Sequence, residues 1–447
     1  MAFPGKKPKL ALFSLTFPMI IENFMRQLVG TVNVFILGHD SDGAAAAVGV
    51  ANQIINLVLM VFTLTAAGAA SAISQYLGAK NEEKAAHLST IVLTLFTACG
   101  VAFSVILAVF AKPLLTAMNL DQSLLPQGAQ YLRIAGSAIF LQVVVAGLSG
   151  ISRSYGNSRP AMTATLLMNL CNLLGSYLVV FRPFEIPLYG VAGVGVMLAA
   201  SELIGCIYMI AYVFGRMQIG MKFSHLRGDV WAELKIIFRY GIPSAMESLT
   251  YNVSQLISTS FIGLLGADAV AARVYLINIV NFSYLIGVSI GQGVQILVGH
   301  YIGAKDYENV EKIHRKAYCL MLPANLTVAL LFLIFRYQIL GLFTTSASII
   351  SLAAPILIFD VVVQLGRTLD HVALYSLRGA GDVRFSMVVS FVSMLAINIG
   401  VGYLCAIVWR LGLVGIWIGF AADEWFRALM ITLRWKSNKW RKMSVVA

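Results

Sequence analysis

Two glutamates stand inside long apolar stretches of this sequence, where a carboxylate could bind a proton or a monovalent cation. Glu22 follows Pro18 by four residues, and Glu247 follows Pro243 by the same spacing. A proline inside a helix leaves one carbonyl without its hydrogen-bond partner and can bend the helix. If these stretches cross a membrane, an ionised side chain there costs at least about 2.5–3.5 kcal/mol. Such residues persist where they face a cavity or a partner, so both are candidates for ion coupling or substrate binding.

The neighbours of the two glutamates along the helix differ. Glu22 has Arg26 four residues on, one turn along the same face. An ion pair between them, with a structural role, is therefore an alternative reading for Glu22. Glu247 has Tyr251 at the matching place, so its carboxyl has no local cation. We therefore favour Glu247 as the group that binds and releases the coupling ion, with Arg26 and Tyr251 as cavity candidates.

A second set of polar residues lies within the apolar stretch 352–376. Three- and four-residue spacing places them on one helix face, which should point into a cavity or the centre of a bundle. They are Asp360, Gln364, Arg367, Asp370 and His371. Arg367 can pair with Asp370 or reach His371. Asp370 is an ion-coupling candidate; Arg367 and Asp360 are cavity candidates, although Asp360 can equally lie at the outer interface.

Further polar groups occur in other apolar stretches. Asp423 and Arg427 can pair at four-residue spacing, which favours a structural role for that cluster. Amides in membrane helices mostly form hydrogen bonds between helices. Among them we keep Gln53 and Asn281 as cavity candidates.

The composition of the chain indicates which kind of secondary structure positions these residues. The chain has 447 residues, of which 59% are hydrophobic and 12% charged, and its mean hydropathy is +0.82. A soluble domain has roughly 25% charged residues. The chain is therefore predicted to be an all-α integral membrane protein. The net charge of +12 is typical of Lys and Arg in cytoplasmic loops, and no nucleic-acid partner is expected.

A membrane-spanning helix needs about 20 mostly apolar residues. Twelve stretches qualify, six in each half of the chain, so both halves enter the membrane in the same direction. They are 14–38, 50–74, 88–111, 129–150, 161–181, 190–214, 239–263, 275–299, 313–335, 352–376, 385–409 and 411–435. Lys and Arg concentrate in the loops on one side. Both termini are therefore predicted to be cytoplasmic.

The two halves are copies of one unit. Gln75-Tyr-Leu-Gly-Ala-Lys-Asn81 is repeated 225 residues later as His300-Tyr-Ile-Gly-Ala-Lys-Asp306, and the same offset places Glu22 on Glu247 and Arg153 on Arg378. Such parallel repeats are related by an axis along the membrane normal. We predict an N-terminal six-helix lobe (1–214), a cytoplasmic linker (215–238) and a C-terminal six-helix lobe (239–447).

Several short motifs resemble the multidrug and toxic compound extrusion (MATE) family. They are Thr31-Val-Asn-Val-Phe-Ile-Leu-Gly38, Val48-Gly-Val-Ala-Asn-Gln53, Gln75-Tyr-Leu-Gly-Ala-Lys80, Gly241-Ile-Pro-Ser-Ala-Met-Glu247 and Ser376-Leu-Arg-Gly-Ala-Gly-Asp382. The resemblance implies a V-shaped pair of lobes that open alternately to either side of the membrane. Many relatives have an Asp at the position of Asn33, carry the seventh-helix carboxylate near Tyr251, and have a tenth-helix acid that corresponds loosely to Asp370.

The expected function is secondary efflux in a bacterial cytoplasmic (inner) membrane. Amphipathic compounds, chiefly organic cations, would leave in exchange for H⁺ or Na⁺, with Glu22, Asn33, Glu247 and Asp370 as ion-coupling or substrate residues. No Gly-rich nucleotide loop and no His/Cys metal spacing is present, so no enzyme activity and no cofactor is expected. The partners are the lipid bilayer, a small substrate and a monovalent cation, and the chain is expected to act as a monomer. The alternative is a flippase for a lipid-linked saccharide or another lipid, since Arg26 and Arg367 would suit an acidic headgroup.

Overall fold

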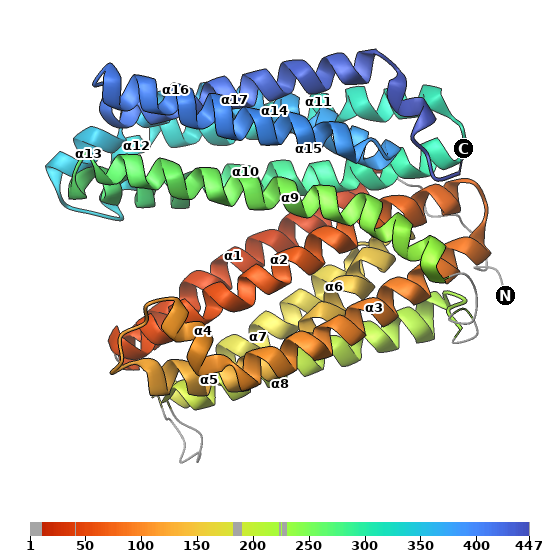
Figure 1. The fold of residues 1–447 in the computed structure, drawn as a ribbon, viewed down its shortest axis with the longest axis horizontal. Coiled ribbons are helices and arrows are strands. Elements are labelled where there is room, and N and C mark those ends of the chain that lie inside the picture. The colour runs from red at the N-terminus through yellow and green to blue at the C-terminus, as the bar shows by residue number, and fades with distance from the viewer. Residues whose placement is uncertain (1–10, 41, 182–189, 223–224, 226–229, 447) are drawn as a thin grey trace. The chain divides into compact units, whose positions relative to one another are not determined.

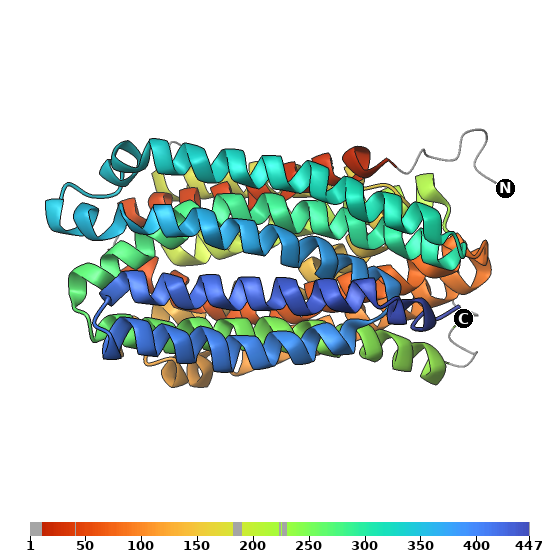
Figure 2. The same ribbon diagram turned by 90° about the horizontal axis from the view of Figure 1, so that it is seen from above.

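The computed structural model describes residues 11–40, 42–181, 190–222, 225 and 230–446, and these residues form helices and no strand. They group into two compact units, which are considered separately here (Figure 1). The first unit contains residues 1–73 and 81–238, and the second contains residues 74–80 and 239–447. Within each unit the long helices run side by side (Figures 1 and 2).

The first unit is built on six predicted spans. α1 lies against α7, α7 against α8, and α3 against α6. Its apolar core gathers Val48, Leu107, Leu132 and Val194 from four helices. The helices are α1 (Leu12–Asp40), α2 (Asp42–Gly78), α3 (Glu82–Val109), α4 (Ala111–Ala117), α5 (Leu125–Ser137), α6 (Ile139–Ser154), α7 (Arg159–Phe181) and α8 (Gly190–Ile210), which continues as a π-helical turn (Ala211–Met217).

In the second unit α14 is the central helix, because it packs against α10, α11 and α17. The polar face of residues 360–371 is therefore enclosed by neighbouring helices. The helices are α9 (Val230–Gly263), α10 (Ala267–Gly303), α11 (Tyr307–Ile334), α12 (Arg336–Gly341), α13 (Ala347–Ala353), α14 (Ile356–Ala380), α15 (Val383–Val392), α16 (Ile399–Tyr403), α17 (Gly412–Lys436) and a 3₁₀ turn (Lys439–Lys442). Two π-helical stretches, Ser393–Asn398 and Leu404–Val408, flank α16.

Every predicted span is helical in the structure. One span is bent, and the linker differs from the prediction. The fourth span consists of α5 and α6, which meet at an angle of 41°. The predicted linker 215–238 is shorter than expected, since α9 already begins at Val230. By length and apolar composition alone, eight helices of the described residues can cross a membrane, or nine if α5 and α6 form one span. The other long helices, α1, α9 and α17, contain Glu22, Glu247 and Asp423.

The repeated motif marks a close crossing of two helix ends. Residues 74–80, at the end of α2, pack within the second unit. A Cβ atom on Gly78 would lie 1.9 Å from the carbonyl oxygen of His300, and a Cβ atom on Gly303 would lie 1.9 Å from that of Gln75. Only glycine allows two backbones to approach so closely. The glycine in each copy of the motif is thus required by its contact with the other copy.

Candidate functional site

The strongest feature common to both repeats is a buried ion pair. In the first unit, Arg153 NH2 on α6 lies 2.6 Å from Glu22 Oε2 on α1. In the second unit, Arg378 NH2 on α14 lies 2.7 Å from Glu247 Oε2 on α9. Both glutamates are buried. The pairs are related by the 225-residue offset, so each copy of the unit joins its first helix to a later one in the same way.

These pairs change the expectations for both glutamates. The closer partner of Glu22 is Arg153, while the predicted partner Arg26 is 3.4 Å away. Among the described residues, Glu247 has no ion pair with a cation of its own helix, but Arg378 supplies a partner from α14. The offset linked all four residues in the sequence, and that signal could have predicted the pairing.

Arg26 and Tyr251, the two cavity candidates near these pairs, are more exposed than the two glutamates. The side chain of Arg26 is half exposed, and its NH2 group donates a hydrogen bond to Thr165 Oγ1 at 3.1 Å. Tyr251 is 36% exposed. Neither side chain is enclosed as Glu22 and Glu247 are, so both can be reached from outside their own unit.

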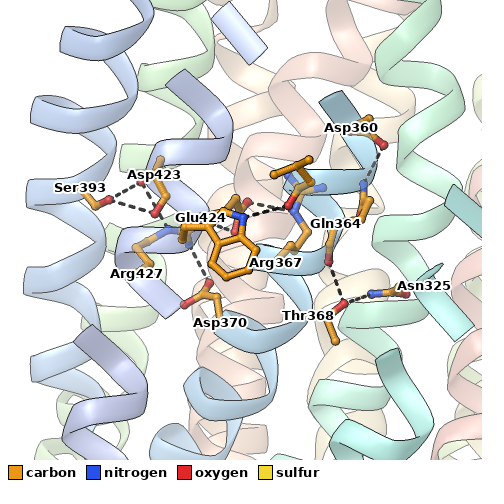
Figure 3. A network of polar contacts seen from close by, with 12 residues as sticks. Asn325, Asp360, Gln364, Arg367, Thr368, Asp370, Ser393, Asp423, Glu424 and Arg427 are labelled. Atoms are coloured by element: carbon orange, nitrogen blue, oxygen red, sulfur yellow. Dashed lines mark hydrogen bonds and ion pairs between the residues drawn. The ribbon is translucent and has the colours of Figure 1, made fainter. Parts of the chain in front are cut away.

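A network of charges lies between α14 and α17 in the second unit (Figure 3). Arg427 is at its centre. Its NH1 lies 3.1 Å from Asp370 Oδ2, its NH2 2.7 Å from Glu424 Oε2, and its Nε 3.4 Å from Asp423 Oδ1. Arg367 Nε donates to Glu424 Oε1 at 2.9 Å. The predicted pair Asp423–Arg427 is present, whereas Arg367 pairs with Glu424 and not with the predicted Asp370 or His371.

The network holds more negative than positive groups. Asp370, Asp423 and Glu424 face Arg367 and Arg427, and all five are buried or nearly so. Asp370 is fully buried, and neither of its carboxylate oxygens accepts a hydrogen bond from the described residues. An uncompensated charge in such a place is costly. The arrangement therefore suits the binding of one proton or one monovalent cation.

Asp360 belongs to a separate hydrogen-bonded chain, nearer the start of α14 than the charge network (Figure 3). Gln364 Nε2 donates to Asp360 Oδ2 at 3.2 Å, and Asn325 Nδ2 donates to Thr368 Oγ1 at 3.0 Å. Asp360 is only 3% exposed. α14 presents this carboxylate to the interior of its unit, one turn after the helix begins at Ile356. Its position near the outer interface stays an alternative prediction.

The remaining sequence candidates are not part of this network. Gln53 is exposed on α2, and Asn281 is half-buried on α10. Neither contributes to the contacts described above. The side chain of Asn33 lies outside the described residues.

The first repeat lacks the network. At the 225-residue offset, Asp370 corresponds to Val145, Arg367 to Gln142, Glu424 to Ala199 and Arg427 to Glu202. The structural Glu–Arg pair is therefore present in both copies, whereas the charge surplus between α14 and α17 occurs in one.

This architecture matches that of a known protein family. The family model MatE matches residues 18–178 and again residues 243–404, one match in each repeat. The chain belongs to the MatE family. The uncharacterized transporter YisQ of Bacillus subtilis is 36% identical over 97% of this chain and 96% of its own length. A probable multidrug resistance protein NorM of Thermotoga maritima is 28% identical over 97% of this chain and 94% of its own.

Solved structures agree with this membership at the level of the fold. An outward-facing multidrug resistance MATE family transporter superposes with a TM-score of 0.88 at 21% identity, over 96% of both chains. A MOP superfamily transporter from Pyrococcus furiosus, described as having a binding pocket of reverse polarity, superposes with a TM-score of 0.88 at 20% identity, over 98% of this chain and all of its own. A chain with the MatE fold is thus a multi-pass membrane protein of twelve helices in two six-helix repeats.

The repeated pair should contribute strongly to the stability of this MatE protein. In Glu247→Gln or Arg378→Gln, one charge stays buried without its partner, so we expect each to lower the free energy of unfolding by about 3 kcal/mol. The double variant should lose clearly less than the sum, because it leaves no unpaired charge. Thermal unfolding of the purified protein in detergent measures this. The exposed pair Lys312–Glu308 is the matched control, and its disruption should cost about 1 kcal/mol or less. Additive losses at Glu247 and Arg378 would contradict the pairing.

Proposed function

We propose that this MatE-family chain is a secondary antiporter that exports amphipathic, chiefly cationic, compounds in exchange for H⁺ or Na⁺. We place it in a bacterial cytoplasmic (inner) membrane with both termini in the cytoplasm. The relatives named as probable multidrug resistance proteins support the efflux role. The concentration of Lys and Arg in loops on one side supports the orientation.

The observation that carries this proposal is the charge surplus of the α14–α17 network. With Asp370, Asp423 and Glu424 all ionised, one negative charge has no guanidinium. Binding of H⁺ or Na⁺ cancels that charge, and its release restores it. We assign the coupling ion to Asp370. Glu424 has both arginines as partners, and Asp423 also accepts a hydrogen bond from the Ser393 hydroxyl, whereas Asp370 has Arg427 alone. A cationic substrate is held more strongly when the network is charged, so ion and substrate alternate.

Coupling of this kind has enough free energy to concentrate a substrate. Exchange of one monovalent ion for one monovalent cation moves no net charge, so the concentration gradient of the ion supplies the free energy. An ion gradient of roughly 40-fold is worth about 2.2 kcal/mol and supports a substrate gradient of roughly 40-fold. No nucleotide is required for that step.

The test uses purified protein in liposomes loaded with a fluorescent cationic dye. A proton gradient and a sodium gradient are imposed separately, and dye movement is followed with and without an ionophore that collapses each gradient. We expect transport under one of the two gradients and its loss with the ionophore. If neither gradient moves the dye, the antiport of cations is excluded and the lipid flippase becomes the better hypothesis. Arg26 and Arg367 are then the residues to substitute, in an assay of lipid-linked saccharide translocation.

A further inference from the structure

A hollow of about 440 Å³ lies on the first unit, between the short helix α4 and helix α5. It is lined by Lys112, Pro126, Ala129, Gln130, Arg133 and Ile134. All but Lys112 belong to α5, at spacings of three and four residues, so they share one face of that helix. The hollow is separate from the ion pairs and from the charge network described above.

This hollow lies where an apolar span ends. α3 is a 28-residue helix that ends at Val109, and α4 begins only two residues later in a new direction. Phe110 is 51% exposed and Met118 is 44% exposed, on either side of α4. Apolar side chains presented by a short helix at the end of a span are typical of the boundary between hydrocarbon and headgroups. The hollow is therefore within reach of lipid headgroups.

The chemistry of its lining is that of an anionic amphiphile site. Pro126, Ala129 and Ile134 supply apolar surface, while the exposed Lys112 and Arg133 supply two positive charges. Neither cation has a carboxylate partner among the ion pairs of the described residues. The planar guanidinium group of Arg133 and the ammonium group of Lys112 together suit a phosphate group.

The acidic residue closest in sequence does not neutralise them. Asp121 accepts hydrogen bonds from the Ser123 backbone N–H at 2.8 Å and from the Ser123 hydroxyl at 2.6 Å. These bonds lower the pKa of its carboxyl below the usual value, and they hold it within its own turn. Among the described residues, Asp121 forms no ion pair with Lys112 or Arg133.

The two cations are not a requirement of the repeated fold. At the 225-residue offset, Lys112 corresponds to Tyr337 and Arg133 to Ile358. The short helix of the second repeat, α12, carries its cation one position earlier, at Arg336, which donates to the Leu333 carbonyl oxygen at 3.1 Å. The pair of cations at these two positions is therefore a feature of the first copy.

We infer that this hollow binds the headgroup of an anionic phospholipid, with its phosphate held by Lys112 and Arg133 and its glycerol and first methylenes against Pro126, Ala129 and Ile134. Gln130 can donate its amide N–H to the same headgroup. The site does not depend on the antiport proposed above, since it makes no use of the ion-coupling residues.

Native mass spectrometry of the full chain in detergent, titrated with phosphatidylglycerol or phosphatidylethanolamine, tests the site. A cation near the membrane surface strengthens binding of an anionic lipid about fivefold, so Lys112→Gln with Arg133→Gln should weaken phosphatidylglycerol binding by roughly 30-fold. Binding of phosphatidylethanolamine should change little. The double variant Arg410→Gln with Lys436→Gln removes the same charges from the ends of α17 and should bind like the wild type within about twofold. Lys112→Arg with Arg133→Lys keeps both charges and should retain binding.

Two results would overturn the site. One is equal binding of phosphatidylglycerol by the wild type and by the variant that lacks both cations. The other is displacement of the lipid by inorganic phosphate or glycerol 3-phosphate at low millimolar concentration, which would assign the hollow to a free anion. If the charge-free variant does not fold, weaker binding of both lipids by Ile134→Gln supports the site, and unchanged binding of both lipids there counts against it.

Discussion

Replacement of Arg427 by leucine is expected to lower the stability of this protein by about 3–5 kcal/mol, because it leaves several buried carboxylates without their main partner. Arg427 is 4% exposed and contacts Asp370, Asp423 and Glu424 through all three of its guanidinium nitrogens. Arg367 reaches Glu424 alone and cannot compensate the other two. The measurement is the temperature at which the purified protein unfolds in detergent, followed by tryptophan fluorescence.

The same measurement separates charge imbalance from lost packing. Arg427→Leu combined with Asp370→Asn and Asp423→Asn removes the uncompensated charges, so it should recover most of the lost stability. The exposed Arg239 is the matched control, and Arg239→Leu should change stability by about 0.5 kcal/mol or less. An Arg427→Leu protein that unfolds at the wild-type temperature would show that the network contributes little to folding.

The sequence was sufficient to predict the helices and the repeat. Spans of about 20 apolar residues can only be helical in a bilayer, since each backbone group must be paired within the segment. The offset that aligns Gln75–Asn81 with His300–Asp306 then defined the two copies. Boundaries were harder, because a polar segment such as 230–238 continues the helix of the following span. Composition does not distinguish such an extension from a linker.

Within the α14–α17 network, spacing along the sequence predicts partners only where they lie on one helix. Asp423 and Arg427 were correctly paired, since a separation of four residues brings side chains together on any helix. Arg367 was paired with the wrong acid, because its partner Glu424 is on another helix and 57 residues away. Packing of α14 against α17 decides that contact, and spacing along one helix carries no information about it.

Comparison of the two repeats separates scaffold from candidate function. The pairs Glu22–Arg153 and Glu247–Arg378 have the same geometry in both copies, as expected for contacts that hold the shared fold together. Asp370, by contrast, corresponds to Val145 in the first copy. A fully buried acid that the fold does not require in one copy needs another reason in the other, and the ion coupling proposed above would provide one.

Asp370→Asn is therefore expected to abolish coupling while the protein still folds. The substitution leaves Asp423 and Glu424 opposite Arg367 and Arg427, so the network becomes neutral and no longer gains free energy from a bound cation. In liposomes, a gradient of the coupling ion of roughly 40-fold, which should concentrate the dye roughly 40-fold in the wild type, should give a dye ratio near one in the variant. Downhill movement of the dye should continue, although the neutral network holds the cationic dye less strongly.

Asp360→Asn is the matched control for this last prediction. It is the same substitution on the same helix, and Asp360 is as well buried, but its carboxylate accepts a hydrogen bond from Gln364 and is not part of the Arg427 network. Asparagine can keep that hydrogen bond, so coupled transport should persist within about twofold. Loss of coupling in both variants would mean that any change on α14 disturbs transport. Persistence of coupling in Asp370→Asn would move the coupling ion away from the α14–α17 network, and Glu247 would then be the carboxylate to test.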